Sequence, residues 1–348
     1  MTAAAHAAAL PARRAWLAPA ALLAMLLAIA AVAAVTFGAV PVVLDDWLAL
    51  TSGGELTGGS YVLWHIRLPR ALFAILVGVA LAMSGALTQG LFRNPLADPT
   101  LLGVSSGATC AAALTIVVLA NLALPPSLRL WLLPLMAMLG AFTVCMALDR
   151  GARWLTPGSI TGLLLAGMAF NAIAMAIVGL CTYLANDEQL RSLSFWTLGS
   201  LAGGGWMQCG ILAVVVALAL WRVNRLARTL NALALGEAAA AHVGVNVASL
   251  RTQLVLMVAL LTGVAVAWSG LISFIGLVAP HIVRSWQGAD QRVLVPLSGL
   301  LGALLMLVAD TIARTAMIPA EAPVGIFTAL LGAPVFLAML RSARGRLA

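Results

Sequence analysis

The sequence repeats a nine-residue pattern, Gly78-Val79-Ala80-Leu81-Ala82-Met83-Ser84-Gly85-Ala86 in its first half and Gly263-Val264-Ala265-Val266-Ala267-Trp268-Ser269-Gly270-Leu271 in its second. Six of the nine positions are identical. A proline, Pro95 or Pro280, follows the second glycine of each copy by ten residues, so we expect a break after each copy. Both copies lie in long apolar segments. This favours a membrane protein with two duplicated halves, an organisation typical of transporters.

The composition indicates a membrane protein. Hydrophobic residues make up 63% of the 348 residues, charged residues make up 9%, and the mean hydropathy is +1.08. Soluble domains carry roughly 25% charged residues, and no soluble core could enclose this much apolar surface. The 32 glycines are typical of helices that pack closely through small residues in lipid.

Apolar runs of roughly 17 to 25 residues predict membrane-spanning helices. Ten such runs lie at residues 15–37, 67–91, 100–123, 130–149, 159–184, 207–222, 251–269, 271–285, 293–315 and 324–341. The predicted fold is an all-α polytopic membrane protein with one transmembrane domain over residues 1–348. The first run follows Arg13 and Arg14 as a secretory signal would, but it is too long for one, and we expect it to be retained.

The distribution of arginine predicts the orientation. An even number of spans places both termini on one side, and 14 of the 19 basic residues then lie on that side. By the positive-inside rule this side is cytoplasmic. Residues 1–14, the loop 229–250 and the tail 342–348 are therefore expected in the cytoplasm. The net charge of +8 then reflects topology and does not indicate nucleic-acid binding.

The two copies of the repeat are predicted to have opposite orientations. The span with the first copy runs inward and the span with the second runs outward. Spans two to five and seven to ten then form an inverted repeat, with spans one and six outside it. The alternative is that glycine- and alanine-rich helices resemble one another by composition alone.

Several kinds of chemistry are missing from the sequence. All 19 basic residues are arginine, so the lysine of a G-x-x-x-x-G-K-[ST] phosphate loop is absent and ATP hydrolysis by that route is excluded. The four cysteines have no paired spacing and are expected to be packing residues. The four histidines are scattered. We therefore predict no catalytic residues and no metal site.

Arginines at the outer ends of two spans are the first polar feature. Arg67 and Arg70 lie at the start of span two, and Arg314 follows Asp310 by one helical turn in span nine. Interfacial anchoring by Arg and by the nearby Trp64 is one explanation, and a local Asp310–Arg314 ion pair is another. The third is that fixed guanidinium groups bind carboxylates of an external partner.

A break rich in proline, Arg93-Asn94-Pro95-Leu96-Ala97-Asp98-Pro99, precedes Ser105 and Ser106 of the third span. It is either an ordinary cytoplasmic turn or a break at membrane depth. Irregular backbone at that depth is tolerated only where it is buried in protein or lines a cavity.

The longest cytoplasmic loop contains Leu233-Ala234-Leu235-Gly236-Glu237, followed by alanines, His242 and Gly244. The alanines predict a short helix that ends at a glycine cap. Because this helix is too short to cross the membrane, it is typical of a docking element for a soluble partner. An ordinary connecting loop is the alternative.

Four motifs, in this order, resemble the permease subunits of ABC importers for iron-siderophores, haem and cobalamin. They are Asn94-Pro95-Leu96-Ala97-Asp98-Pro99, Leu233-Ala234-Leu235-Gly236-Glu237, Ser273-Phe274-Ile275-Gly276-Leu277-Val278-Ala279-Pro280-His281 and Leu331-Gly332-Ala333-Pro334-Val335-Phe336. The resemblance extends from about residue 60 to 341. It implies a ten-span permease in the bacterial inner membrane, paired with a second copy of itself, with the translocation path on the dimer axis.

The resemblance also implies partners and site residues. Two ATPase subunits, which hold the ATP and Mg, would bind the cytoplasmic loop at Leu233, Leu235, Gly236, Glu237, His242 and Gly244. A periplasmic haem-binding protein would dock its glutamates on Arg67, Arg70 and Arg314. The translocation path is expected to include Asn94, Pro95, Ser105, Ser106 and Tyr183. This chain itself is expected to bind no cofactor, with haem as the transported substrate.

The substrate is predicted from two stretches. Residues 183–201 and 102–108 look most like the haem-importing members of the family. Ferric siderophores and cobalamin remain alternatives. An ion-coupled secondary transporter shares inverted repeats, but such carriers need acidic groups at mid-membrane, and Asp310 is the main candidate here. A structural subunit without a path is a further alternative.

Overall fold

The computed structural model of this chain describes residues 16–52, 58–119, 125–156, 159–318 and 320–344. Within these ranges all regular secondary structure is helical. The predicted cytoplasmic segment 1–14, and residues 345–348 of the predicted tail, lie outside the described residues.

Helices follow one another along the whole described chain. In order they are α1 (Leu17–Thr36), α2 (Leu44–Ser52), α3 (Gly58–Tyr61), the π-helical turn η1 (Val62–Arg67), α4 (Leu68–Phe92), the 3-10 turn η2 (Pro99–Leu102), α5 (Val104–Val117), α6 (Pro126–Leu155), α7 (Ile160–Leu184), α8 (Asp187–Leu198), α9 (Trp206–Ala234), α10 (Glu237–His242), α11 (Val247–Ser269), α12 (Ile275–Gln287), α13 (Gln291–Thr315) and α14 (Val324–Arg344).

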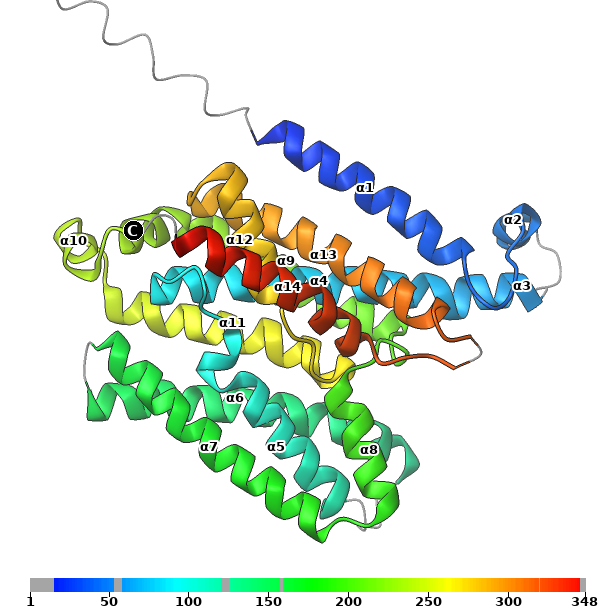
Figure 1. Ribbon diagram of the computed structural model, residues 1–348, viewed down its shortest axis with the longest axis horizontal. Coiled ribbons are helices and arrows are strands. Elements are labelled where there is room, and N and C mark those ends of the chain that lie inside the picture. The colour runs from blue at the N-terminus through cyan, green and yellow to red at the C-terminus, as the bar shows by residue number, and fades with distance from the viewer. Residues whose placement is uncertain (1–15, 53–57, 120–124, 157–158, 319, 345–348) are drawn as a thin grey trace, which may run out of the picture.

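The long helices lie roughly along one direction, with α10 at one end of the molecule and α8 at the other (Figure 1). Below, these are the α10 end and the α8 end. Seven helices among the described residues are long and apolar enough to cross a membrane, and the other three predicted runs overlap α5, α12 and α14. The prediction of an all-helical polytopic membrane protein is therefore confirmed.

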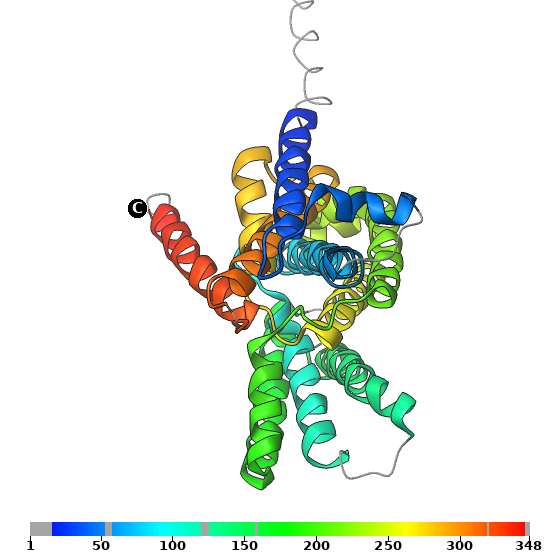
Figure 2. The ribbon, with the colours of Figure 1, turned by 90° about the vertical axis from the view of Figure 1, so that its right-hand side faces the viewer.

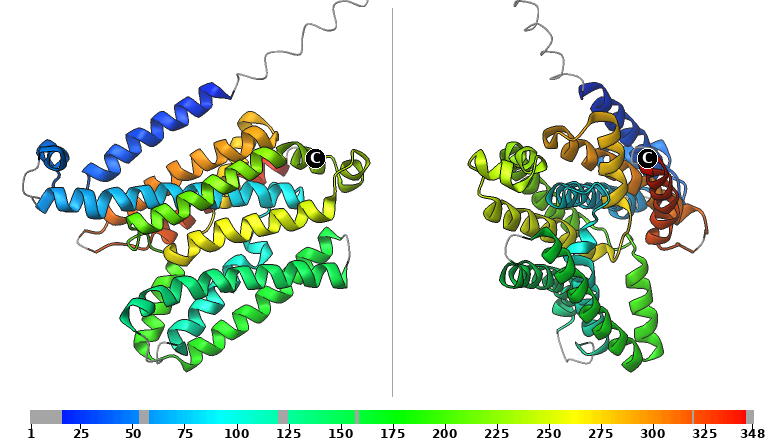
Figure 3. Two further views of the ribbon diagram at one scale, coloured as in Figure 1. Left: turned by 180° about the vertical axis from the view of Figure 1, so that it is seen from behind. Right: turned by 60° about the vertical axis from the view of Figure 1, so that its left-hand side comes forward.

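Helix α4 runs through the centre of the molecule (Figure 2). It packs against α13, α11, α12 and α9. Small residues allow this close packing, because a Cβ on Gly78 would overlap the carbonyl of Gly302 on α13. Helices α5, α6 and α7 form a second group on one side, and α14 stands apart on another (Figures 2 and 3).

Helix contacts come in matched pairs. In the predicted repeat α11 corresponds to α4, α12 to α5 and α13 to α6. Accordingly, α4 packs on α13 and α11 packs on α6. In the same way, α5 packs on α6 and α12 packs on α13. Helices α4 and α11 run antiparallel and touch each other (Figure 1). The first glycine of each sequence copy lies at a matched crossing, Gly78 at α4–α13 and Gly263 beside Ala141 of α6. An inverted repeat predicts this pattern.

The second glycines of the two copies differ in setting, and the expected break at Pro280 is wrong. Gly270, with φ +66°, ends α11, whereas α4 continues beyond Gly85 to Phe92. The second break is therefore at residues 270–274, and Pro280 lies inside α12. Proline has no N–H to donate to the carbonyl of Gly276 four residues earlier. A Cβ on Gly85 would overlap that same carbonyl, so α4 and α12 meet there.

Span two begins earlier than predicted, because α3, η1 and α4 form one helix from Gly58 to Phe92. Pro69 does not end it. The π-helical turn η1 immediately precedes Leu68 and Pro69, where a proline cannot donate the α-helical hydrogen bond. Arg67 and Arg70 consequently lie within a helix and not at its mouth.

Candidate functional site

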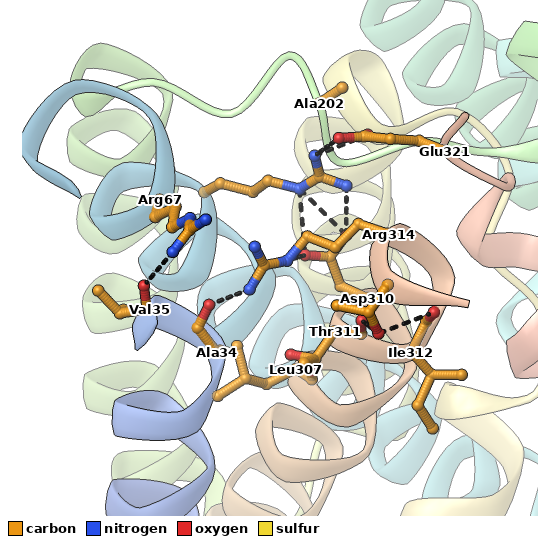
Figure 4. Close-up of polar contacts among 12 residues, drawn as sticks. Ala34, Val35, Arg67, Ala202, Leu307, Asp310, Thr311, Ile312, Arg314 and Glu321 are labelled. Carbon is orange, nitrogen blue, oxygen red and sulfur yellow. Dashed lines mark hydrogen bonds and ion pairs between the residues drawn. The ribbon is translucent and has the colours of Figure 1, made fainter. Parts of the chain in front are cut away.

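A cluster of buried and partly buried charges, with one exposed carboxylate, lies toward the α8 end, where α1, α4, α13 and the α13–α14 loop meet (Figure 4). Its members are Arg67, Arg70, Asp310, Arg314 and Glu321, and this set is called the arginine cluster below. All three arginines predicted to dock an external partner belong to it. The sequence predicted neither Glu321 nor the contact between the two halves.

Arg70 of α4 is 8% exposed and binds two carboxylates. Its Nε and Nη2 donate to Asp310 of α13, with Nη2 2.9 Å from Oδ1 and Nε 3.1 Å from Oδ2. Its Nη1 donates to both oxygens of Glu321, at 3.0 and 2.8 Å. Asp310 is buried, whereas 48% of the Glu321 side chain is exposed. Bidentate Arg–carboxylate pairs are among the strongest polar contacts in proteins.

Arg67 and Arg314 hold the end of α1. Arg67 Nη1 donates to the carbonyls of Val35 and Thr36, at 3.1 and 2.9 Å, and Arg314 Nη2 donates to Ala34. The last carbonyls of a helix lack intrahelical donors and carry the negative end of its dipole. The two guanidinium groups therefore cap α1 from α13 and from the helix that contains α4.

The predicted ion pair between Asp310 and Arg314 is a long one. Arg314 Nε lies 4.0 Å from Asp310 Oδ2, whereas Arg70 makes the short hydrogen bonds. Three cations and two anions leave the cluster with one excess positive charge. Every arginine of the cluster also has a partner inside the chain. Glu321 is the exposed one of the two carboxylates that bind Arg70, so an outside carboxylate would reach Arg70 at the position of Glu321.

The predicted short helix in the cytoplasmic loop is present as α10 (Glu237–His242). Gly236 (φ +117°) and Gly244 (φ +83°) flank it with conformations that favour glycine. Leu233 is buried at the end of α9, while Leu235 is 81% exposed. His242 Nδ1 lies 2.7 Å from the carbonyl oxygen of Ala238 within the helix.

An ion pair ties α10 to the next membrane helix. Glu237 Oε1 accepts from Arg251 Nη2 of α11 at 2.6 Å, and Arg251 is buried. The guanidinium of Arg93 lies 3.6 Å from where a Cβ on Gly236 would stand. The turn into α10 therefore touches the end of α4, where the first break begins.

The first half of that break is a surface turn. Asn94 and Pro95 are exposed, and the Asn94 side chain accepts from the backbone N–H of Leu96 at 2.9 Å. The second half turns inward, where Asp98 accepts from the N–H of Thr100 and caps η2. The break is therefore a surface turn at its start and faces inward at its end.

The two breaks meet around cavities. Asp98 and Thr100 line one of about 310 Å³ together with Ser273, Phe274, Leu277 and Phe336. Ser105 lines a small neighbouring cavity of about 20 Å³. Residues from the first break and from the second thus face a common space, beside α14.

The remaining predicted path residues lie apart from these cavities. Ser106 donates to the carbonyl of Gly103 at 3.1 Å and to the side chain of Asn171 on α7. Tyr183 is 85% exposed at the α8 end of α7. Within the described ranges no three His, Cys, Asp or Glu side chains come together as a metal site would need.

Known proteins with similar sequences are membrane permeases. The model of the FecCD transport family matches residues 26–342. The chain is 46% identical over 285 residues to the hemin transport system permease protein HmuU of Yersinia pestis, covering 81% of this chain and 84% of that protein. It is 42% identical over 305 residues to the vitamin B12 import system permease protein BtuC of Salmonella newport (strain SL254), covering 86% and 90%.

Solved structures share the fold of this chain. A metal-chelate type ABC transporter in an inward-facing conformation superimposes with a TM-score of 0.80 and 32% identity, over 92% of this chain and 97% of that one. PsaBC from Streptococcus pneumoniae, solved with a Fab, shares the fold at a TM-score of 0.57 and 17% identity, over 80% and 92%. The chain, a permease subunit of the ABC importer type, therefore belongs to the FecCD transport family.

Proposed function

We propose that this chain is the membrane permease of a binding-protein-dependent ABC importer for haem. The observation that carries the proposal is its 46% identity to a hemin permease over 81% of the chain. The likeness of residues 183–201 to haem-importing members supports the same substrate. The energy comes from a partner, because a sequence without lysine has no phosphate loop of its own.

The proposed architecture has ten spans, with both termini in the cytoplasm of a bacterium and the domain in its inner membrane. The matched helix contacts around α4 and α11 support an inverted repeat of spans two to five and seven to ten. The arginine distribution supports the orientation, since 14 of 19 fall on the terminal side. The α10 end is then cytoplasmic and the α8 end periplasmic.

In this proposal α10 is where two ATPase subunits dock. Leu235 and Val243, which flank α10, are 81% and 72% exposed, and the exposed residues of α10 between them are mostly alanines. An exposed apolar pair of this kind suits a protein partner. Arg93, at the start of the first break, lies against the turn at Gly236, so a movement of α10 would displace the start of this break.

A periplasmic binding protein would dock at the opposite end. The excess positive charge of the arginine cluster would attract carboxylates, and the accessible Glu321 marks the point of approach to Arg70. A second copy of the chain would complete a path between the protomers. The cavities at the two breaks would belong to that path, together with Asn94, Pro95, Ser105, Ser106 and Tyr183.

Cobalamin is the second candidate substrate, because a vitamin B12 permease is 42% identical over 86% of the chain. A ferric siderophore is a weaker third. An ion-coupled carrier is disfavoured by the setting of Asp310. Its carboxylate is held by Arg70 in a bidentate pair, so it has little freedom to bind and release a coupling ion.

Uptake in cells tests the substrate assignment. The chain would be expressed with its partner ATPase and binding protein, in a strain without its own haem, cobalamin and siderophore permeases. We expect haem to accumulate at least tenfold faster than cobalamin or a ferric siderophore. Faster uptake of cobalamin would replace haem by the second candidate.

A further inference from the structure

A cavity of about 700 Å³ at the α8 end belongs to none of the sites described above. It lies between α5, α6, α8 and the end of α11, within a single chain. Ligand cavities in proteins typically have volumes of about 300 to 1,000 Å³. The cavity is large enough for a sizeable ligand, and the proposed function assigns it no role.

The wall formed by α8 is fixed at both ends. At its start, Gln189 completes a capping box with Asn186 and donates to the carbonyl of Val117 at the end of α5, at 3.3 Å. Beyond its end, the N–H of Ser200 donates to the carbonyl of Ser269 at 2.8 Å. Leu193 packs between α5 and α7. The helix therefore bridges the cavity, and the space is preformed.

One face of α8 lines the cavity. Its residues recur at helical spacing and are Glu188, Gln189, Ser192, Phe195 and Trp196. The opposite walls supply Ile116, Leu133 and Trp268. Trp268 is held in place by an edge-to-face contact with Trp131 of α6, at 6.1 Å between ring centroids. The lining thus combines these apolar and aromatic residues with polar side chains, among them Gln189, Ser192 and Ser269.

Two opposite charges complete the lining. Arg129 near the start of α6 and Glu188 near the start of α8 both border the cavity. Both side chains are exposed, and among the described residues neither forms an ion pair with another side chain. The ring of Phe195 is 60% exposed and is available to an apolar ligand. A matching ligand carries an anion, a cation and an apolar body.

We propose that this cavity is a binding site for a zwitterionic phospholipid with a primary ammonium group, such as phosphatidylethanolamine. The phosphate would face Arg129, the ammonium would face Glu188, and the acyl chains would lie on Phe195 and Trp268. The position at the ends of α5, α6 and α11 suits a lipid headgroup, because aromatic residues gather at membrane interfaces.

The charges argue against two other occupants. Haem carries two carboxylates, and a dianion near Glu188 would be repelled. An anionic lipid such as phosphatidylglycerol would satisfy Arg129 and leave Glu188 without a partner. Phosphatidylcholine has the right charges but no N–H to donate, so it should bind more weakly than phosphatidylethanolamine.

Native mass spectrometry of the purified, delipidated full-length protein tests the proposal. It would be titrated in detergent with phosphatidylethanolamine, phosphatidylglycerol and phosphatidylcholine. We expect at least a tenfold preference for phosphatidylethanolamine over phosphatidylglycerol. Arg129→Glu should remove most of the binding, and Glu188→Arg should reverse the preference. Arg191→Glu is the matched control, because Arg191 is an exposed arginine on α8 that does not line the cavity.

A cavity-filling variant separates this proposal from a general effect of charge. Ser192→Trp places a large side chain in the cavity and leaves the net charge unchanged, so it should also remove most of the binding. Four results would each overturn the proposal. They are equal binding of the three lipids by the wild type, an unchanged preference in Glu188→Arg, full binding by Ser192→Trp, and displacement of the lipid by haem.

Discussion

At the scale of single residues, the arginine cluster explains how charged side chains are tolerated inside apolar helices. A cation at the centre of a membrane helix costs about 2.5 to 3.5 kcal/mol on insertion scales. Arg70 offsets this cost with two carboxylates, and Arg67 with the carbonyls that end α1. Replacing Arg67 or Arg314 would therefore disturb α1 as well as any docking surface.

Glu321 gives a cleaner test of docking at the arginine cluster. If a partner's carboxylate binds Arg70, Glu321 competes with it, because both need Nη1. Glu321→Gln should therefore tighten the affinity for the binding protein by roughly tenfold, which corresponds to about 1.4 kcal/mol. Charge-assisted hydrogen bonds contribute about 1.5 to 3 kcal/mol, so a change of this size is expected. Titration with immobilised permease at low salt measures it.

Asp187→Asn is the control for the Glu321 experiment. Asp187 is an exposed acid at the same end that makes no ion pair with Arg67, Arg70 or Arg314. It should change the affinity only slightly. An unchanged or weaker affinity in Glu321→Gln would show that the binding protein does not use Arg70.

The sequence identified the polar residues of the cluster but not their partners. Asp310 and Arg314 were noticeable because ionisable groups in an apolar span are rare. Arg70 lies 240 residues from Asp310 in the sequence, and no local pattern relates them. Glu321 and Asn171 gave no signal, since each is an isolated polar residue whose role depends on a distant side chain.

At the scale of helices, small residues set how closely α4 approaches its neighbours. Gly85 and Gly276 are in direct backbone contact, at the carbonyl that Pro280 leaves without a helical donor. Gly78 and Gly302 form a similar contact between α4 and α13. Since the matched helices α11 and α6 are separated by Ala141, the α4 side of the repeat is packed more tightly.

Gly85→Ala should destabilise the protein, because the added methyl group overlaps the Gly276 carbonyl and would force α4 and α12 apart. Overpacking of this kind costs about 1 to 3 kcal/mol. We expect a lower midpoint of thermal unfolding in detergent. Gly179→Ala on α7 is the matched control, because a Cβ there meets no atom within 4 Å. An equal midpoint for Gly85→Ala and the wild type would contradict the close contact.

Glu237→Arg should uncouple ATP hydrolysis from transport. The substitution replaces the ion pair with Arg251 by two neighbouring cations, so α10 would lose its tie to α11. We expect transport to fall by tenfold or more while the folded protein survives. Uptake and ATPase activity would be measured together in proteoliposomes. Wild-type transport, with the ATPase bound at wild-type strength, would show that α10 is an ordinary connection.

Hydropathy predicted the long helices well and the irregular parts poorly. Each predicted run overlaps one helix, because length and apolarity are local properties. Helix α8 was missed because its mean composition is polar, although the Asn186–Gln189 capping box is a local start signal. The boundary between the predicted runs 251–269 and 271–285 coincides with the break at 270–274, but the break expected at Pro280 is absent, because this proline is tolerated where α12 packs on α4.

At the scale of the whole molecule, the two halves of the repeat meet at a cavity that is lined by the first break, at residues 93–99, and by the second, at residues 270–274. Helices α4 and α11 bring Asp98 and Ser273 to one cavity, and α10 contacts the start of the first break through Gly236 and Arg93. The first break therefore has its start beside the turn that precedes α10 and its end at this cavity. Such an arrangement suits transport driven by a partner at the α10 end.

Transport by purified components tests the central claim most directly. The chain would be reconstituted in proteoliposomes with its ATPase and binding protein, and haem uptake would be measured with and without ATP. We predict that uptake needs ATP, the ATPase and the binding protein together, and that collapsing proton and sodium gradients leaves it unchanged. Haem uptake by the chain alone, driven by an ion gradient, would contradict the account.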